Sequence, residues 1–316
     1  MRSARVVALS GGVGGAKLAL GLYRVLPPDS LTVIVNTGDD FDHFDLRICP
    51  DLDTVTYTLA GMANPVTGWG LEGESWSFMA QMKALGGEDW FQLGDRDLAI
   101  HVLRSQWLRR GESLTQVTRK IVAALGVKAA VLPMSDAPVR TRVQTASGLL
   151  DFQDYFVRLK CDVSITGLRF DGAAEAGPTD AVERALDDAE MMIFCPSNPF
   201  VSIDPILAIT GIHDRLKATR VPRVAVSPII GGKAVKGPAA KMMAELGYEV
   251  SSLTVARKYR GLIDGMVIDV ADGDLEADIR ALGMAVKTTR TLMLNAEDSA
   301  RLAAETVEFA RQLGGR

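Results

Sequence analysis

Short apolar runs alternate with helical patterns along the chain, and this alternation limits the possible folds more than any other feature of the sequence. The runs Val6–Leu9 and Leu31–Val35 are continuous and apolar, as is typical of strands buried on both faces of a sheet. Similar runs follow at Ala129–Leu132, Met191–Phe194, Val224–Val226, Val267–Val270 and Met284–Lys287. The order of strand, glycine- or proline-rich turn and helix predicts an α/β fold with a mostly parallel sheet and helices on both faces.

Two stretches interrupt this order. The segment 64–110 has a helical pattern and contains all four tryptophans (Trp69, Trp76, Trp90 and Trp107), so we expect a helical insertion there. Residues 140–170 alternate between apolar and polar positions, which predicts an antiparallel excursion. Because no repeat or linker divides the chain, we predict a single α/β domain over residues 1–316 that carries this insertion.

A glycine-rich segment, SGGVGGAK, directly follows the first apolar run, and a helical pattern begins near Ala16. Glycines let backbone amides approach a ligand, and a helix N-terminus attracts anions, so this segment is a candidate phosphate site. It is not a Walker A loop, because no hydroxyl residue follows the lysine, and the dinucleotide-binding fingerprint lacks its third small residue. The alternative is a tight turn without a ligand. The candidate residues are Gly12, Val13, Gly14, Gly15 and Lys17.

The acidic segment Asn36–Thr54 follows the second apolar run and carries six aspartates, at positions 39, 40, 42, 45, 51 and 53. Carboxylates at this density repel one another unless solvent or a cation relieves the repulsion. Oxygen ligands on a loop suit Mg²⁺, which takes a few carboxylates together with phosphate and water. The alternative is a solvated acidic loop in which Asp53 caps a helix that begins near Thr54.

Two later loops also follow apolar runs. Cys195–Leu207 forms a rigid polar turn that could present amides and hydroxyls to a phosphate or a base, or could serve only as a turn and helix cap. Ser227–Ala239 combines glycines with Lys233 and Lys236, which suits a phosphate, although a solvated basic loop is the alternative. Ligands of open parallel sheets bind at the carboxyl ends of the strands, so we expect these loops to converge.

Composition argues against several other classes of protein. The net charge of −4 gives no sign of a nucleic-acid surface, and no apolar stretch suits a membrane span or a signal peptide. The three cysteines and three histidines are scattered, which fits the cytoplasm and no zinc site. Two candidate phosphate loops and an acidic loop, without an obvious nucleophile, indicate phosphoryl-group chemistry, in which positioning and charge neutralisation carry most of the rate.

Six motifs, taken in order, resemble the 2-phospho-L-lactate transferase family of coenzyme F420 biosynthesis. They are SGGVGGAK (Ser10–Lys17), NTGDD (Asn36–Asp40), CPDLDT (Cys49–Thr54), LGDRDLA (Leu93–Ala99), CPSNPFVSIDPIL (Cys195–Leu207) and SPIIGGKAVKGPA (Ser227–Ala239). The resemblance implies a Rossmann-like fold, a homodimer and Mg²⁺ as cofactor. It also implies transfer of 2-phospholactate, phosphoenolpyruvate or a phosphoglycerate from its guanosine-diphosphate adduct to the ribityl hydroxyl of the deazaflavin FO. GMP would be released, and neither nucleic acid nor membrane would take part.

The matching motifs imply roles for individual residues. The catalytic residues would be Lys17, Asp40 and Asp51, and the metal ligands would be Asp40, Asp51 and Asp53. The guanylated donor or its GDP part would be bound by Gly12, Val13, Gly14, Gly15, Thr37, Asn198, Ser202, Gly232, Lys233 and Lys236. Trp69 and Asp95, in the insertion, would belong to the wall around the deazaflavin.

Two other functions are compatible with parts of the sequence. A regulatory protein of the same fold that binds a nucleotide sugar would keep the pockets without the transfer, but the acidic segment and LGDRDLA favour the transferase. A nicotinamide-dependent dehydrogenase is disfavoured, because Asn36 and Thr37 stand where a ribose-binding acid is expected. The three candidate acids differ by few atoms, so the sequence leaves the choice among them open.

Overall fold

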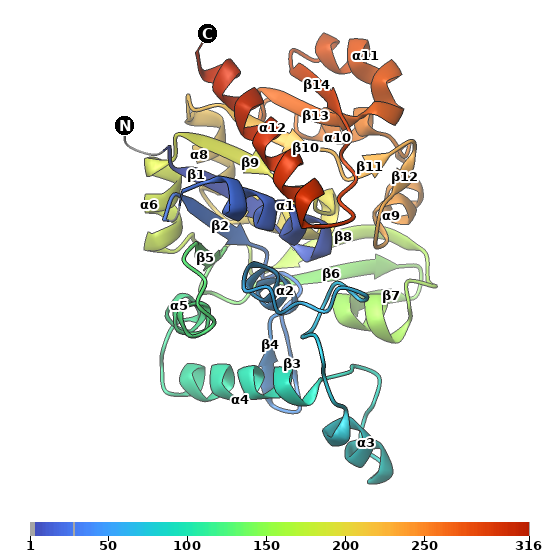
Figure 1. Ribbon diagram of the computed structural model, residues 1–316. Helices are drawn as coiled ribbons and strands as arrows, with labels where there is room; N and C mark the ends of the chain where they lie inside the picture. Colours follow the sequence, from blue (N-terminus) through green and yellow to red (C-terminus); the bar gives the residue numbers. More distant parts are fainter. Residues whose placement is uncertain (1–3, 28, 316) are drawn as a thin grey trace.

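Seven parallel strands form the central sheet of the computed structural model, which describes residues 4–27 and 29–315 (Figure 1). The order across the sheet is β14-β13-β10-β9-β1-β2-β5. The strands are β1 (Val6–Ser10), β2 (Leu31–Val35), β5 (Ala130–Pro133), β9 (Met191–Phe194), β10 (Arg223–Val226), β13 (Gly265–Asp269) and β14 (Ala285–Thr289). The predicted α/β fold with a parallel sheet is confirmed.

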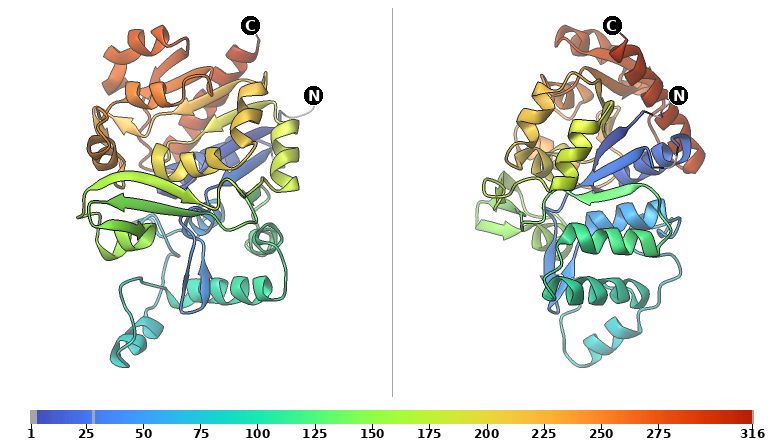
Figure 2. Two further views of the ribbon diagram at one scale, coloured as in Figure 1. Left: turned by 180° about the vertical axis from the view of Figure 1, so that it is seen from behind. Right: turned by 90° about the vertical axis from the view of Figure 1, so that its left-hand side faces the viewer.

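Helices cover both faces of this sheet. Along β1, Val6 and Ala8 belong to one hydrophobic cluster and Val7 and Leu9 to another, because successive side chains of a strand point to opposite faces. The first layer contains α1 (Gly12–Val25), α2 (Pro50–Leu59), α5 (Leu114–Ala124) and α12 (Ala296–Gly314). The second contains α6 (Asp180–Asp188), α7 (Asp204–Ala208), α8 (Ile212–Ala218), α9 (Ala239–Glu245), α10 (Ser252–Lys258) and α11 (Glu276–Ala281). Figure 2 shows the two layers on opposite sides of the sheet.

Two helices begin about one turn earlier than the sequence predicts. Helix α1 begins at Gly12 rather than near Ala16, so the glycines form its first turns instead of a loop before it. Helix α2 begins at Pro50 rather than near Thr54, because proline has the fixed φ that suits the first helical position. The alternative in which Asp53 caps this helix is therefore wrong: Cys49 is the N-cap, and Asp53 lies within the first turn.

The predicted antiparallel excursion is present as a three-stranded sheet of β6 (Arg140–Thr145), β7 (Gly148–Asp151) and β8 (Ile165–Asp171), in the order β7-β6-β8. A two-residue turn at Gly231 and Gly232, both with positive φ, joins β11 (Ile229–Ile230) to β12 (Lys233–Ala234). This hairpin carries Lys233, and Lys236 follows it by two residues.

The insertion contains α3 (Ser77–Ala84) and α4 (Asp95–Arg109), which extend beyond the sheet in all views (Figures 1 and 2). A hairpin of β3 (Phe41–His43) and β4 (Leu46–Ile48), formed by the acidic segment, packs against it through a small apolar cluster. Among the described residues, no helix combines the length and the apolar character needed to cross a membrane.

Asp95 and Asp97 lie in the first turn of α4 and do not cap it. Gly94 is the N-cap, and the amides of Arg96 and Asp97 donate to Glu74, each at 2.8 Å. Asp95 instead accepts hydrogen bonds from the amides of Ser77 and Phe78 at the start of α3, at 3.0 and 2.9 Å. Each helix start is thus capped by a residue that adjoins the other helix, which fixes α3 relative to α4.

Candidate functional site

The turn from β1 into α1 packs directly against the loop that follows β9. A methyl group on Gly14 would lie 2.5 Å from the carbonyl oxygen of Pro196, and one on Gly15 would overlap the hydroxyl of Ser197. The hydroxyl of Ser197 also accepts a hydrogen bond from the amide of Gly11, at 3.0 Å. Close packing therefore accounts for the glycines at 14 and 15, and phosphate binding by this turn stays a prediction.

Asp51 lies against the same turn. A Cβ atom on Gly11 would lie 2.5 Å from Asp51 Oδ2, and the amide of Gly12 donates a hydrogen bond to this carboxylate. Asn36 donates to Asp51 Oδ2 at 2.9 Å and to the carbonyl of Val201 at 3.1 Å. Burial raises the pKa of Asp51 to about 6, although the hydrogen bonds from Asn36 and Gly12 oppose the shift. The acidic segment, the glycine turn and the β9 loop thus meet, as the sequence predicts.

Asp39 and Asp40 are both buried but have different neighbours, since Asp39 lies near Asp51 and Asp40 lies near Cys49. Burial and the charge of Asp51 raise the pKa of Asp39 well above its usual range. Burial raises the pKa of Asp40 to about 7, opposed by a hydrogen bond from Cys49 and by the charge of Arg140. Oδ1 of each aspartate is buried and has no hydrogen-bond partner among the described residues.

This arrangement fits a divalent cation, because a cation would relieve the repulsion and supply the missing partners. The charge of Asp51 acts on Asp39. The metal ligands predicted from the sequence included Asp40 but not Asp39. The two cannot be distinguished by sequence position, because both follow β2 directly.

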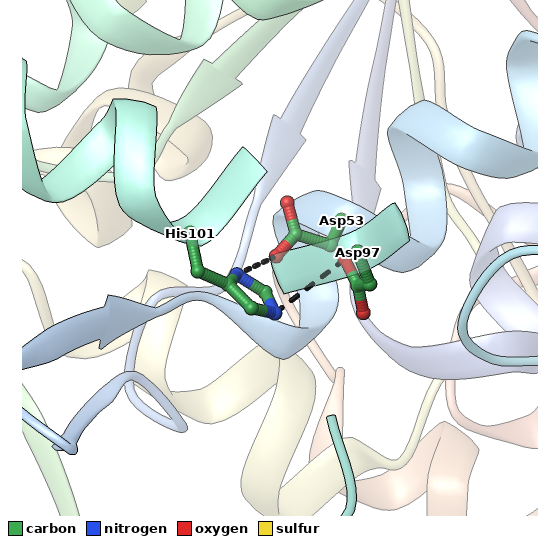
Figure 3. Close-up of side chains that lie close together, drawn as sticks. All are labelled: Asp53, Asp97 and His101. Carbon is green, nitrogen blue, oxygen red and sulfur yellow. Dashed lines mark ion pairs between the residues drawn. The ribbon is translucent and has the colours of Figure 1, made fainter. Parts of the chain in front are cut away.

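The third predicted metal ligand, Asp53, points into a different group (Figure 3). It forms a buried ion pair with Arg104 of α4, in which Arg104 Nη1 lies 3.0 Å from Asp53 Oδ2. His101 lies between Asp53 and Asp97, at 3.7 Å and 3.4 Å. Although Asp53, Asp97 and His101 lie close enough to share an ion, the bidentate guanidinium already occupies Asp53. We interpret this group as a link between α2 and α4.

The lysines of the predicted phosphate site lie near one another. Lys17 donates to the carbonyl of Met293 at 2.8 Å, and burial followed by the charge of Lys236 lowers its pKa. Lys236 donates to the carbonyl of Thr67 at 3.2 Å, and Gly68 packs against Val13. The insertion therefore begins directly beside the glycine turn and the basic loop.

The remaining predicted residues differ in burial and in whether their side chains already have hydrogen-bond partners. Ser202 is buried against Gly11, whereas the side chain of Asn198 accepts a hydrogen bond from the amide of Phe200 at 3.0 Å and caps its own turn. Lys233 is exposed, and Thr37 is buried with no partner for its hydroxyl among the described residues. In the insertion, Trp69 is 48% exposed, and the carboxylate of Asp95 is occupied by α3.

Two cavities open beside Asp40. The larger, of about 380 Å³, is lined by Asp39 and Asp40, by the aromatic residues Phe41, Trp90 and Phe152, and by Arg158. The guanidinium of Arg158 lies 4.4 Å from the centre of the Trp90 ring. The smaller, of about 210 Å³, is lined by Thr37, Arg47 and the apolar side chains of Leu108 and Leu114. Asp40 and Arg140 line both cavities.

The chain is similar in sequence to known transferases over most of its length. The family model described as "2-phospho-L-lactate transferase CofD" matches residues 6–308. The "Phosphoenolpyruvate transferase" of Kitasatospora aureofaciens is 43% identical over 316 residues, covering 98% of each chain. The "2-phospho-L-lactate transferase" of Methanosarcina mazei is 40% identical over 303 residues, covering 96% of this chain and 99% of that one.

A solved structure supports the fold alone. A member of the UPF0052 family from Bacillus halodurans superposes with a TM-score of 0.63 at 15% identity, covering 97% of this chain and 99% of that one. The family match extends over nearly the whole chain, and full-length relatives lie near 40% identity. This chain therefore belongs to the 2-phospho-L-lactate transferase family and is a transferase of coenzyme F420 biosynthesis.

Proposed function

We propose that this chain transfers a phosphorylated three-carbon acid from its guanosine-diphosphate adduct to the ribityl hydroxyl of the deazaflavin FO and releases GMP. One observation carries the proposal: buried carboxylates meet the glycine turn of α1 beside a cavity with aromatic walls. The names of the relatives, which specify phosphoenolpyruvate or 2-phospho-L-lactate, support a donor of this class.

The donor side would be formed by the glycine turn and the lysines around it. The FO hydroxyl would attack the phosphorus that bears the three-carbon acid, and the bond to the GMP oxygen would break. Lys17 and Lys236, held by carbonyl groups near the N-terminus of α1, would stabilise the negative charge that develops on the leaving GMP. Asn198 and Ser202 line the adjoining loop and would position the guanosine diphosphate.

Mg²⁺ would be held by Asp51 with Asp39, because the unpartnered Oδ1 of Asp39 and its repulsion by Asp51 fit a cation. Bound there, it would supply charge neutralisation for the phosphates. Asp53 is already paired with Arg104, so it would not bind the ion but would hold α2 in place relative to α4. Asp40, with a pKa of about 7 and a side chain at the larger cavity, is suited to accept the proton of the attacking hydroxyl.

The acceptor FO would occupy the larger cavity. Its aromatic walls suit a deazaflavin ring, and Asp39 and Asp40 lie where the ribityl chain would reach the phosphates. The insertion contributes Trp90 to this wall, whereas Trp69 and Trp76 are about half exposed. The proposed contact between insertion and deazaflavin therefore rests on Trp90.

Replacing Trp90 with alanine is expected to weaken FO binding by about 1–3 kcal/mol, the usual value of an aromatic stacking partner for a planar base. FO titration followed by calorimetry measures the change. Trp76→Ala, a change at an exposed tryptophan of the same insertion, is the matched control and should leave FO affinity unchanged. Equal losses in the two variants would argue against the larger cavity as the FO site.

Removing the two lysines of the basic loop is expected to weaken GDP binding. Each of Lys233→Ala and Lys236→Ala removes one charge-assisted contact, with an expected loss of about 1.5–3 kcal/mol. Calorimetric titration with GDP measures it, and Lys217→Ala, an exposed lysine on α8, is the control. Unchanged GDP affinity in the double variant would contradict the assignment of this loop.

The reaction itself is tested by incubating the native chain with FO, Mg²⁺ and each guanylated acid, followed by mass analysis. The expected result is an anionic FO derivative that carries the phosphoacid, together with an equal amount of GMP. The lactyl and enol products differ in mass by one H₂, so the same spectrum identifies the preferred acid. Donor binding without any FO product would instead support a binding protein.

A further inference from the structure

Arg140 occupies the boundary between the two cavities. It is the first residue of β6, and its side chain lines both the larger cavity and the smaller one. Its Nη1 donates to the carbonyl of Val139 at 2.9 Å. Burial lowers the pKa of this guanidinium, and the charge of Asp40 only partly opposes the shift. Arg140 is thus a partly buried cation whose charge is incompletely balanced.

The other arginines that line the cavities already have carboxylate partners. Arg47 pairs with Asp42 at 2.8 Å, and Arg158 pairs with Asp154 at 3.2 Å. Arg142 pairs with both Asp151 and Asp171. Among the described residues, Arg140 is the one cavity-lining arginine without a carboxylate at ion-pair distance. A carboxylate ligand entering here would therefore find a guanidinium that has no carboxylate partner and that keeps N–H donors besides the one bound to Val139.

A short chain of hydrogen bonds joins this position to the glycine turn. The amide of Thr141 donates to the carbonyl of Gly38 at 2.7 Å, and the amide of Gly38 donates to Asn36 Oδ1 at 2.8 Å. Asn36 in turn donates to Asp51, which lies against Gly11. The start of β6 is therefore fixed relative to the proposed phosphate site.

All three candidate acids carry a carboxylate, and a site that binds only the diphosphate would leave this group unrecognised. We propose that Arg140 binds the carboxylate of the transferred three-carbon acid, with its carbon chain in the smaller cavity between Leu108 and Leu114. This inference rests on the proposed function and adds a determinant of substrate specificity. Arg140 favours the binding of adducts that bear a carboxylate over other guanosine-diphosphate esters, such as nucleotide sugars.

The test compares two ligands that differ in one group, in the absence of FO so that no transfer occurs. Guanylated 2-phospholactate is titrated by calorimetry against the isopropyl ester of GDP, in which a methyl group replaces the carboxylate. The native chain is expected to bind the carboxylate ligand about 10- to 100-fold more tightly. In Arg140→Met this ratio is expected to fall to about one, while the affinity for GDP stays unchanged.

Two further variants complete the design. Arg140→Lys, which keeps the charge without the fork, is expected to give an intermediate ratio. Arg169→Met, which removes an exposed arginine from the neighbouring strand β8, is expected to keep the native ratio. If Arg140→Met kept the native ratio, the proposed role of Arg140 would be overturned, while the proposed function would be unaffected. Failure of the native chain to bind either GDP or the guanylated acid would instead contradict the proposed function.

Discussion

Replacing Asp51 with asparagine is expected to reduce transfer about 10²- to 10³-fold, the usual cost of losing one preorganised group that stabilises charge in a transition state. Asn keeps an oxygen that can accept the hydrogen bonds from Asn36 and Gly12, so the fold should persist. Steady-state rates with saturating donor and FO measure the loss. Asp45→Asn, an exposed aspartate of the same acidic segment, is the control and should retain native turnover.

The same substitution has a defined effect on stability. Burial raises the pKa of Asp51 from 3.8 to about 6, so the folded chain holds this proton over a pH range in which the unfolded chain releases it. The contribution of Asp51 to stability therefore falls as pH rises from about 4 to 6, and ionised Asp51 is destabilising at higher pH. In metal-free buffer at pH 8, Asp51→Asn should consequently melt no lower than the native chain.

Mg²⁺ provides the complementary measurement. EDTA should abolish transfer and added Mg²⁺ should restore it, and Mg²⁺ should raise the melting temperature of the native chain more at pH 8 than at pH 5, because ligands must be deprotonated. Full activity in metal-free buffer, or native turnover in Asp51→Asn, would exclude this assignment of the acidic segment.

Replacing Arg104 with leucine is expected to cost about 3–5 kcal/mol of unfolding free energy, because it leaves Asp53 as an unpaired buried charge. Arg104 is only 2% exposed, so its ion pair with Asp53 is shielded from solvent. Denaturant unfolding followed by circular dichroism measures the loss. Arg110→Leu, at the exposed end of the same helix, should change the free energy by less than about 0.5 kcal/mol.

The double variant Asp53→Asn with Arg104→Leu distinguishes two causes of the lost stability, the unpaired charge of Asp53 and the lost packing around Arg104. Removing the stranded carboxylate should recover most of the lost stability, since apolar or neutral groups can replace a buried ion pair at small cost. If the double variant were as unstable as Arg104→Leu alone, lost packing around α4 rather than the unpaired charge would account for the effect.

Features that depend on local pattern were predictable from the sequence. The runs around Val6–Leu9 and Leu31–Val35 became the neighbouring strands β1 and β2, because continuous apolar runs can be buried only inside a covered sheet. The meeting of the glycine turn with the acidic segment followed from a general property of parallel sheets, whose carboxyl ends share one edge.

Features that depend on pairing between distant residues were not predictable. Arg104 resembles any charged residue of an amphipathic helix until α4 is placed against α2, where it pairs with Asp53. Asp95 caps α3 from its position in α4, a contact between two helices that its sequence context does not indicate, and its place in the deazaflavin wall stays a prediction. Asp39 and Asp40 are adjacent in sequence, and only their opposite neighbours, Asp51 and Cys49, distinguish them.

The central place of β1 determines when this protein can fold during synthesis. Val6 pairs with Leu31 on one side and with Met191 on the other, so one edge of the first strand made has no partner until well over half of the chain has been synthesised. Such long-range pairing slows folding, and an apolar strand with a free edge is prone to associate with other chains. A truncated chain that ends before β9 is therefore expected to aggregate. During synthesis, the free edge of β1 must be shielded from other chains, for example by a chaperone, until β9 has been made.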